Sequence, residues 1–382
     1  RNEQGAAAHP ARPRRPGGRA DVADVSALRA NGVDMYLRNS WYVAAWDHEV
    51  QRLKLFRRIL LGEPVVFYRK TDGAPVALED RCCHRHAPLS HGRLRGDKVE
   101  CGYHGLQFDP SGACVHIPTQ DTIPKSARVR SYPVVEKHHW IWIWMGDPAA
   151  ADEALIPDFG VMSDPNWNWR GERLQVAGNY LLIIENLMDL THLPSLHLTT
   201  LADTAIPANE IPVEYKIESD RITVDRWVLD TPAPPYFRLL AKFTKEDRVD
   251  RWMNTVFTPP TYVRIDIGAA HTGTGARQGD RGRGVTTWNL NAVTPETERS
   301  SHYFWAQAQN FAKDDPSIAE LDFQLVHSAF QEDLAMIKGQ QENIDLAPNA
   351  PRLDLATDRA GIQARRMVER MTRDERVPAA AE

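Results

Sequence analysis

Two short strings in the first third of the chain, Cys82-Cys83-His84 and Cys101-Gly102-Tyr103-His104, decide how the rest of the sequence is interpreted. Each string begins with a cysteine and ends with a histidine, two or three positions apart. Residues 85–100 separate the strings, which is enough chain for a hairpin that brings two loops face to face. The spacing therefore predicts one site with two cysteine and two histidine ligands, held by neighbouring loops.

Two kinds of metal centre use such a ligand set. Zinc accepts two Cys and two His, but zinc motifs usually pair Cys with Cys and His with His. Here each half contains one of each, which suits a Rieske [2Fe–2S] cluster, where two histidines replace two cysteines on one iron. We therefore expect a cluster held by Cys82, His84, Cys101 and His104. A zinc-binding interaction module is the less favoured alternative.

Length and composition limit the class of protein. The chain has 382 residues, 42% hydrophobic and 25% charged, with a formal net charge of −5. These values are ordinary for a globular protein with room for two domains, and the lack of a basic face argues against nucleic acid as a partner. The longest apolar runs are short, and residues 140–145 are far fewer than the roughly 18 residues of a membrane span. We expect no nucleic-acid partner, no membrane partner and a cytoplasmic location.

Segments of different character follow one another along the chain. Residues 1–34 are rich in Ala, Arg, Pro and Gly, which predicts a disordered tail. Residues 35–150 contain strand-like runs separated by turn residues, which predicts a small all-β domain with the cluster on its loops. The strands predicted there are residues 41–46, 59–61, 64–68 and 140–145.

The last segment, residues 151–382, starts with a linker rich in proline and alanine. We predict a helix over 180–192, strands over 211–215, 222–229, 263–267, 285–292 and 303–309, and helices over 318–341 and 360–371. Strands in the middle and helices at the ends predict an α+β domain, an antiparallel sheet with helices on one face, of the helix-grip type.

The predicted helix over residues 180–192 points to a second metal site. It is apolar almost all round, so its polar residues need buried partners. Asn186, Asp189 and His192 recur every third residue along one stripe. Pro194 then interrupts the helix, which allows His197 to turn back toward His192. Two histidines and one carboxylate, with open positions, are the facial triad of non-haem Fe(II) oxygenases.

The carboxylate of this second site comes from elsewhere in the sequence. Asp333, on the long C-terminal helix, is the preferred candidate, and its neighbour Glu332 is the alternative. A lone buried histidine is more often a core residue than a ligand. The pair of histidines interrupted by a proline, beside a buried acid, favours the metal.

Together these residues resemble a known family, the Rieske non-haem iron oxygenases, over residues 36–372. Within the family, the strings are similar to those of the subgroup with the oxygenase components of vanillate O-demethylase and toluenesulfonate methyl-monooxygenase. The strings that carry it include Asn39-Ser40-Trp41-Tyr42-Val43-Ala44-Ala45-Trp46, Arg81-Cys82-Cys83-His84-Arg85, Trp142-Ile143-Trp144-Met145-Gly146-Asp147-Pro148 and Asn186-Leu187-Met188-Asp189-Leu190-Thr191-His192. Cys83 is a departure, since most relatives have proline there, and it affects only the tuning of the cluster.

The resemblance implies roles for the second site. It implies a mononuclear iron with the ligands His192, His197 and Asp333. Asn186 and Asp189 are the catalytic residues it suggests beside that iron. Asp189 would connect the iron to the cluster of a neighbouring subunit through His104. Such a relay needs a head-to-tail ring, and the resemblance implies a homotrimer.

The resemblance also implies an enzyme, the terminal oxygenase of a monooxygenase system. Electrons from NAD(P)H would arrive through a separate flavin and iron–sulfur reductase, since no dinucleotide-binding motif is visible in the sequence. The expected substrate is a small anionic aromatic, hydroxylated with O2 at a methyl or methoxy group. By similarity to dicamba monooxygenase, the candidate substrate-binding residues are Asn254, Asn291 and Gln324.

Two other functions stay open at this point. A ring-hydroxylating dioxygenase, which makes a cis-diol from an aromatic acid, uses the same metals, and the vanillate-like strings favour monooxygenation over it. A Rieske electron carrier without catalysis has no use for a buried Asp189, His192 and His197, so the region after residue 150 argues against it.

Overall fold

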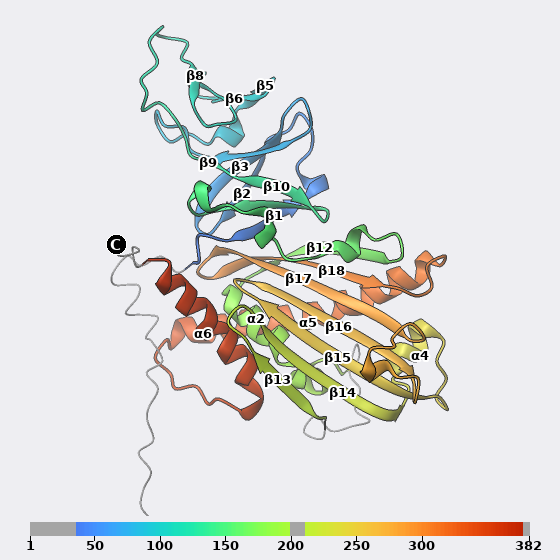
Figure 1. The fold of residues 1–382 in the computed structure, drawn as a ribbon. Coiled ribbons are helices and arrows are strands. Elements are labelled where there is room, and N and C mark those ends of the chain that lie inside the picture. The colour runs from blue at the N-terminus through green and yellow to red at the C-terminus, as the bar shows by residue number, and fades with distance from the viewer. Residues whose placement is uncertain (1–35, 199–210, 377–382) are drawn as a thin grey trace, which may run out of the picture. The chain divides into compact units, whose positions relative to one another are not determined.

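The computed structural model describes residues 36–198 and 211–376, and the tail predicted over residues 1–34 lies outside these ranges. From Tyr36 onward the described residues belong to one compact unit. They form three small sheets in the first part of the chain and one large sheet in the second (Figure 1). The predicted α+β class, a β-sheet cluster domain before a sheet-and-helix domain, is confirmed. The division at residue 150 stays a prediction.

The first part consists of short antiparallel strands. Their bounds are β1 (Trp41–Trp46), β2 (Phe56–Leu60), β3 (Glu63–Arg69), β4 (Pro75–Glu79), β5 (Arg93–Arg95), β6 (Lys98–Glu100), β7 (Gln107–Phe108), β8 (Cys114–His116), β9 (Ser131–Tyr132), β10 (Val134–Lys137) and β11 (Trp140–Trp144). The sheet orders are β1-β11-β10, β2-β3-β4-β9 and β5-β6-β7-β8. The four strands predicted here correspond to β1, β2, β3 and β11.

Strand β11 explains the apolar run over residues 140–145. Its three tryptophans face a core that includes Tyr262 and Phe304 of the large sheet. Ile141 and Ile143 point the other way, into a second core. Because both faces of β11 are buried, the run has no alternation of apolar and polar residues.

The second part contains one antiparallel sheet with the strand order β12-β18-β17-β16-β15-β14-β13. The strands are β12 (Asn168–Val176), β13 (Val213–Ile217), β14 (Ile222–Pro232), β15 (Arg248–Thr258), β16 (Tyr262–His271), β17 (Val285–Thr297) and β18 (Ser300–Gln309). The strands β12 and β15 were not among the predictions. β13 was predicted two residues too early, and β14, β16, β17 and β18 were predicted with shorter bounds.

Helices lie against one face of this sheet (Figure 1). They are α2 (Tyr180–Met188), α3 (Leu193–Leu196), α4 (Pro235–Ala241), α5 (Pro316–Leu346) and α6 (Arg359–Asp374), of which α3 and α4 were not predicted. Short 3-10 helices are η1 (Asp47–Glu49), η2 (Leu89–His91), η3 (Pro148–Ala150), η4 (Glu153–Leu155), η5 (Gly160–Ser163), η6 (Leu190–His192), η8 (Ala276–Gln278) and η9 (Ala356–Asp358). In the described ranges no helix combines the length and the apolar character of a membrane span.

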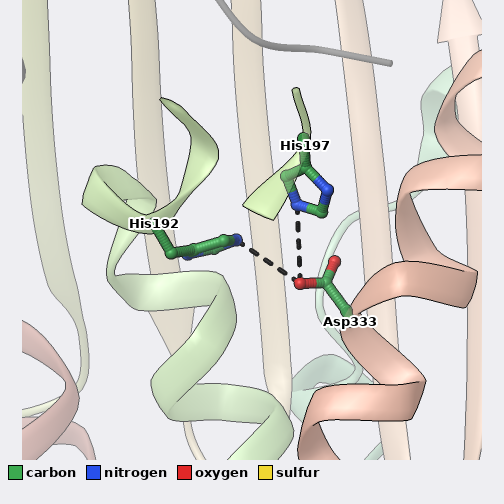
Figure 2. Close-up of side chains that lie close together, drawn as sticks. All are labelled: His192, His197 and Asp333. Atoms are coloured by element: carbon green, nitrogen blue, oxygen red, sulfur yellow. Dashed lines mark ion pairs between the residues drawn. The ribbon is translucent and has the colours of Figure 1, made fainter. Parts of the chain in front are cut away.

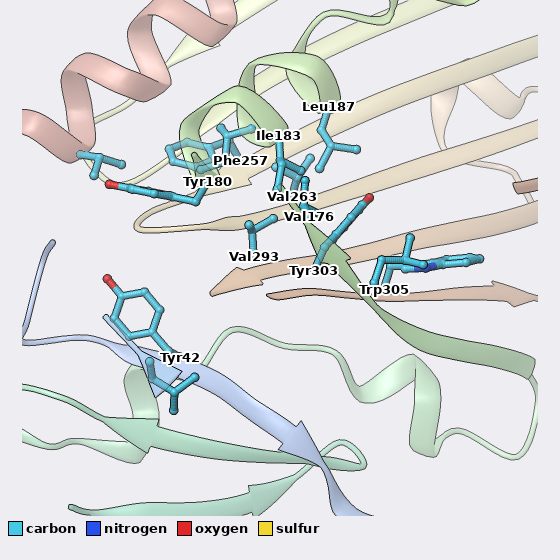
Figure 3. Close-up of a cluster of buried hydrophobic side chains, with 14 of the residues drawn as sticks. Tyr42, Val176, Tyr180, Ile183, Leu187, Phe257, Val263, Val293, Tyr303 and Trp305 are labelled. Carbon is cyan, nitrogen blue, oxygen red and sulfur yellow. The ribbon is translucent and has the colours of Figure 1, made fainter. Parts of the chain in front are cut away.

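The main core lies between α2 and the large sheet. Ile183 and Leu187 of α2 share it with Phe257, Val263 and Val293 from three strands (Figure 3). The helix was predicted to be apolar almost all round, and this side of it is buried against the sheet. This packing fixes the direction in which the chain leaves α2 toward the candidate site.

The helix predicted over residues 180–192 is shorter than expected. α2 ends at Met188, and Asp189 leaves the helical conformation with φ −115° and ψ 96°. The Asp189 carboxylate accepts hydrogen bonds from Thr191 N and Oγ1, at 3.0 and 2.6 Å, and so caps the short helix η6. An aspartate favours this capping position over a helix interior because its side chain competes for backbone N–H groups.

The role predicted for Pro194 is also wrong. Pro194 is the second residue of α3 and lies in its first turn. The first turn needs no proline N–H, so proline is tolerated there. His192 ends η6 and His197 follows α3, so the chain between the two histidines is the short helix α3.

Hydrogen bonds connect the large sheet to the strands of the first part. The buried Thr294 donates through Oγ1 to the carbonyl of Val43 at 2.7 Å. The N–H of Leu61 donates to the carbonyl of Pro295 at 2.8 Å. The end of β17 is thus bonded both to β1 and to the turn between β2 and β3.

Replacing Thr294 by Val tests this connection. The variant keeps the shape of the side chain but removes the hydroxyl donor to Val43. We expect the free energy of unfolding to fall by about 1–3 kcal/mol, measured by urea denaturation. Thr297→Val is the control, because that hydroxyl bonds to Ser300 in an exposed turn, and its effect should stay within about 0.5 kcal/mol. Equal losses in both variants would contradict a special role for the buried bond.

Candidate active site

Two histidines and one aspartate from separate elements converge at one point (Figure 2). His192 ends η6, His197 follows α3, and Asp333 lies within α5. One potential ligand atom of each lies within 4.8 Å of the others. The Nε2 atoms of His192 and His197 are 3.4 and 3.5 Å from Asp333 Oδ1. The structure therefore brings together the three residues predicted to ligate iron.

The other ring nitrogen of each histidine is held by a neighbour. His192 Nδ1 lies 2.5 Å from the carbonyl oxygen of Asp189. His197 Nδ1 lies 2.7 Å from Glu332 Oε2. Contacts of this kind set the tautomer and leave Nε2 free to bind a metal. Glu332, the alternative carboxylate, therefore lies behind His197, outside the group of three.

Charge and burial at this group fit a metal cation. Burial opposes charge on His197, but hydrogen bonds to Asp333 and Glu332 keep its pKa above the ordinary value. Burial also opposes charge on Asp333, yet hydrogen bonds from His192 and His197 keep the pKa of this carboxyl below its usual range. The donor set, two imidazoles and one carboxylate on one side of a point, is the one that Fe(II) uses in non-haem oxygenases.

Asn186 supports the carboxylate of this group. Its Nδ2 donates to Asp333 Oδ1 at 2.8 Å. We expect Asn186→Ala to weaken Fe(II) binding by about 10- to 100-fold, the usual effect of losing an outer hydrogen bond to a ligand. Titration with chelator-buffered Fe(II) measures this. Asn343→Ala, on the exposed side of α5, is the control, and an equal loss there would contradict the assignment.

The two strings predicted to hold the cluster fold into loops with the same backbone hydrogen bonds. The N–H of each cysteine donates to the carbonyl five residues later, at 2.9 Å for Cys82 and 2.8 Å for Cys101. The carbonyls of these cysteines accept from His86 and Gly105, four residues later. Both of those residues have left-handed φ, 57° and 74°. The two loops thus present their ligands in equivalent ways.

The four predicted cluster ligands lie on these loops. The rings of His84 and His104 have centroids 4.5 Å apart, and both cysteines are buried. Burial, with the neighbouring Cys101, raises the pKa of the Cys82 thiol. Holding both sulfurs as thiolates therefore needs a cationic centre between them, which is what a [2Fe–2S] cluster provides.

Asn254 and Asn291, two of the predicted substrate-binding residues, point to opposite faces of the large sheet. Asn291 pairs with Val263 of β16, and Asn254 pairs with Asp266 of the same strand. Residues three apart in a strand lie on opposite faces. Val263 packs in the core with α2, so Asn291 lies on the face of the helices and of the metal group. Asn254 lies on the other face and is not suited to contact a substrate there.

The remaining two candidates have other partners. Asn291 Nδ2 donates to Asn289 Oδ1 at 2.8 Å, and its Oδ1 accepts from the Tyr303 hydroxyl at 2.6 Å. Both the nitrogen and the oxygen of its side-chain amide are therefore hydrogen-bonded to other residues of the protein. Gln324 lies on the exposed side of α5 and donates to Glu320 of the same helix at 2.8 Å.

A buried polar network on the same sheet face escaped the sequence prediction. Asn289 donates to Gln307 Oε1 at 3.1 Å, and Gln307 donates to Asp322 Oδ2 at 3.2 Å. The hydroxyl of Tyr236 in α4 also donates to Asp322, at 2.6 Å. Burial raises the pKa of Asp322 to about 6. The one feature of the sequence that could have drawn attention to Asp322 is its position, about three helical turns before Asp333 on α5.

Comparison with known proteins gives a match for each of the two parts of the chain. Residues 40–133 match the description of a Rieske [2Fe-2S] domain. Residues 176–374 match the vanillate O-demethylase oxygenase C-terminal domain. The iron-sulfur subunit of the toluene-4-sulfonate monooxygenase system of Comamonas testosteroni is 43% identical over 343 residues, which are 89% of this chain and 98% of that protein.

Solved structures of a related oxygenase are similar to this chain over most of its length. Dicamba monooxygenase bound to 3,6-dichlorosalicylic acid is similar with a TM-score of 0.82 and 32% identity, over 90% of this chain and 99% of that one. A structure of the same enzyme with non-heme iron and dicamba has a TM-score of 0.75 and 34% identity, over 89% and 98% of the two chains.

These similarities define the class of protein, which is an oxygenase that combines a Rieske cluster with a mononuclear non-haem iron. The chain belongs to the Rieske non-haem iron oxygenases, in the group whose catalytic domain is that of the vanillate O-demethylase oxygenase component. It is a monooxygenase component that acts with O2. The zinc module and the electron carrier without catalysis are no longer supported as alternatives.

Proposed function

We propose that this oxygenase component hydroxylates the methyl or methoxy carbon of a small aromatic with a carboxylate or sulfonate. Its relatives are named for toluene-4-sulfonate and dicamba. The observation that carries the proposal is the presence in one chain of both sites, the paired cluster loops and the group of His192, His197 and Asp333. O2 is the co-substrate, and a separate NAD(P)H-dependent flavin and iron–sulfur reductase is the partner.

We assign the ligands as follows. The cluster is held by Cys82, His84, Cys101 and His104, and the mononuclear iron by His192, His197 and Asp333. When bound, the two groups supply one-electron transfer and the activation of O2. The protein supplies position: Asn186 orients Asp333, and the Asp189 carbonyl orients His192. Oxygen insertion at a methyl ether yields a phenol and formaldehyde, and at an aryl methyl group it yields a benzylic alcohol.

We further propose that electrons pass between subunits of a homotrimer. In this arrangement Asp189 contacts His104 of the partner subunit. Two observations support it: Tyr103, next to His104 at the loop tip, is 62% exposed, and the Asp189 carbonyl is bonded to His192. Asp189→Asn should keep both metals and a reducible cluster, while product per reduced cluster falls. Light scattering tests the mass of the trimer, and a monomeric holoprotein with full activity would contradict the proposal.

Single-turnover product analysis tests the reaction itself. The protein with both sites filled is chemically reduced and exposed to ¹⁸O₂ with vanillate-like and toluenesulfonate-like aromatics, and the products are examined by mass spectrometry. Formaldehyde with a phenol establishes O-demethylation, and a labelled benzylic alcohol establishes methyl hydroxylation. Two labelled oxygens on the ring would overturn the proposal in favour of the dioxygenase. A cytoplasmic location remains a prediction that cell fractionation tests.

A further inference from the structure

Two arginines are neighbours on the helix-facing side of the large sheet. Val228 of β14 pairs with Arg251 of β15, and Arg226 lies two residues before Val228 on the same face. Ile222, four residues before Arg226, also shares this face and belongs to the core with α2. Arg226 and Arg251 are thus diagonal neighbours, with Cβ atoms about 7–8 Å apart, within reach of long side chains.

Arg226 is a buried charge whose side chain has no hydrogen-bonded partner among the described residues. It is 8% exposed. Its backbone N–H donates to Asn254 Oδ1 at 3.3 Å, but within residues 36–198 and 211–376 no acceptor is bonded to its guanidinium. Burial lowers its pKa and Arg251 lowers it further, while the charge of Asp189 opposes them. A buried guanidinium with five unused N–H donors is costly, and a bound anion would offset that cost.

The surroundings of Arg226 suit an aromatic anion beside the metal group. Asp189, the acid whose charge acts on Arg226, also accepts from His192 through its carbonyl. On the same face, Met253 of β15 stands opposite Arg226 and pairs with Ile267 of β16, and both are half-buried. Two strand spacings measure about 10 Å, close to the length of a benzene ring with two substituents. The apolar surface of Met253 and Ile267 therefore suits the aromatic ring of a substrate. Arg226, at one end of this surface, suits its acidic group.

We propose that Arg226, with Arg251 beside it, is the anion subsite of this oxygenase and determines its specificity for aromatic carboxylates or sulfonates. The guanidinium of Arg226 donates to the anionic oxygens, a geometry that arginine offers and a neutral side chain does not. This inference rests on the proposed function, because it concerns the substrate of the same site. It is tested by binding, which does not depend on turnover.

The experiment compares two probes that differ in charge, toluene-4-sulfonate and the neutral toluene-4-sulfonamide. Calorimetry on the holoprotein gives the Kd of each for the parent and for Arg226→Gln. We expect the variant to bind the sulfonate about 10- to 100-fold more weakly, the loss typical of a charge-assisted hydrogen bond in a buried site. Binding of the sulfonamide should change less than about 3-fold. In turnover, KM for the anion should rise more than kcat falls.

Controls separate the subsite from general effects. Arg221→Gln removes a charge just before β14, where Arg221 is exposed and paired with Asp220, and it should bind both probes like the parent. Arg226→Lys keeps the charge and should retain part of the affinity, which also covers the case that the Gln variant does not fold. Arg251→Gln should weaken the sulfonate selectively, but less.

Three results would overturn the subsite. These are equal affinity of the parent for both probes, equal losses for both probes in Arg226→Gln, or unchanged affinity with slower reoxidation of the cluster. The last would mean that Arg226 positions Asp189 instead. Selective binding of the sulfonate that depends on Arg226, without any hydroxylated product, would support the subsite and count against the proposed reaction, so the two failures are distinguishable.

Discussion

Replacement of Asp333 by Asn is expected to abolish product formation while the iron–sulfur cluster stays in place. Asp333 contributes the carboxylate of the group of three, and its Oδ1 is the atom that both histidine Nε2 atoms face. An amide lacks the negative charge that holds a divalent cation against two neutral imidazoles. We expect loss of the mononuclear iron and a fall in product of about 10³-fold or more, as when a member of a catalytic unit is removed.

The measurements separate the two metal sites. Iron analysis and the electron paramagnetic resonance signal of the reduced cluster should show an intact [2Fe–2S] centre in Asp333→Asn. Glu332→Gln is the matched control, because Glu332 is next in sequence but contacts the outer nitrogen of His197. It should keep its iron with at most about a 10- to 100-fold lower affinity. If Glu332→Gln lost the iron and Asp333→Asn kept it, the assignment of the carboxylate would be reversed.

Asp322→Asn is expected to make the protein more stable at pH 8. Asp322 is 1% exposed, and its hydrogen-bond donors, Tyr236 and Gln307, are neutral. Burial raises its pKa from 3.8 to about 6, so the folded state binds the proton more tightly than the unfolded state. The stability from this group is complete below about pH 4 and is lost as the pH rises through 6. Above that pH, the ionised carboxylate lowers the free energy of unfolding by about 3 kcal/mol. The neutral amide of the Asn variant avoids part of this loss.

The expected gain at pH 8 is about 1–3 kcal/mol, because the amide still accepts from Tyr236 but fits Gln307 less well. Urea denaturation of the holoprotein at pH 5 and pH 8 measures it. The advantage of the variant should shrink at pH 5, where Asp322 is protonated. Asp314→Asn, an exposed acid just before α5, should show no such dependence on pH. An Asp322 variant that is less stable at both pH values would refute the burial argument.

Sequence alone predicted the features that are local in the chain. The cluster loops could be recognised because the two ligands of each loop lie within four positions of each other. The two strings fold into equivalent turns. The strand β11 was predicted because its whole length is apolar. The histidines of the iron group were predicted from their spacing, although the helix ends at Met188 and the bend lies elsewhere.

The features that depend on distant partners were missed or misplaced. β15 does not look like a strand because both of its faces contain polar residues: Arg251 on the helix side and Asn254 on the other. Asp322 looks like an ordinary charge of a helix until Tyr236 and Gln307, from α4 and β18, are placed around it. Which face a residue occupies depends on register across several strands, so Asn254 could not be separated from Asn291 by sequence reasoning.

The bonds between the large sheet and the strands of the first part limit how this protein can be recombined. Thr294 and Pro295 at the end of β17 are bonded to Val43 and Leu61, which lie more than 200 positions earlier. A cluster domain taken from a relative would have to make the same hydrogen bonds to β17. It would also need the tryptophan face of β11 that packs on the sheet. The two parts are therefore expected to be inherited as one block, with new substrate ranges arising by substitutions on the helix-facing side of the sheet.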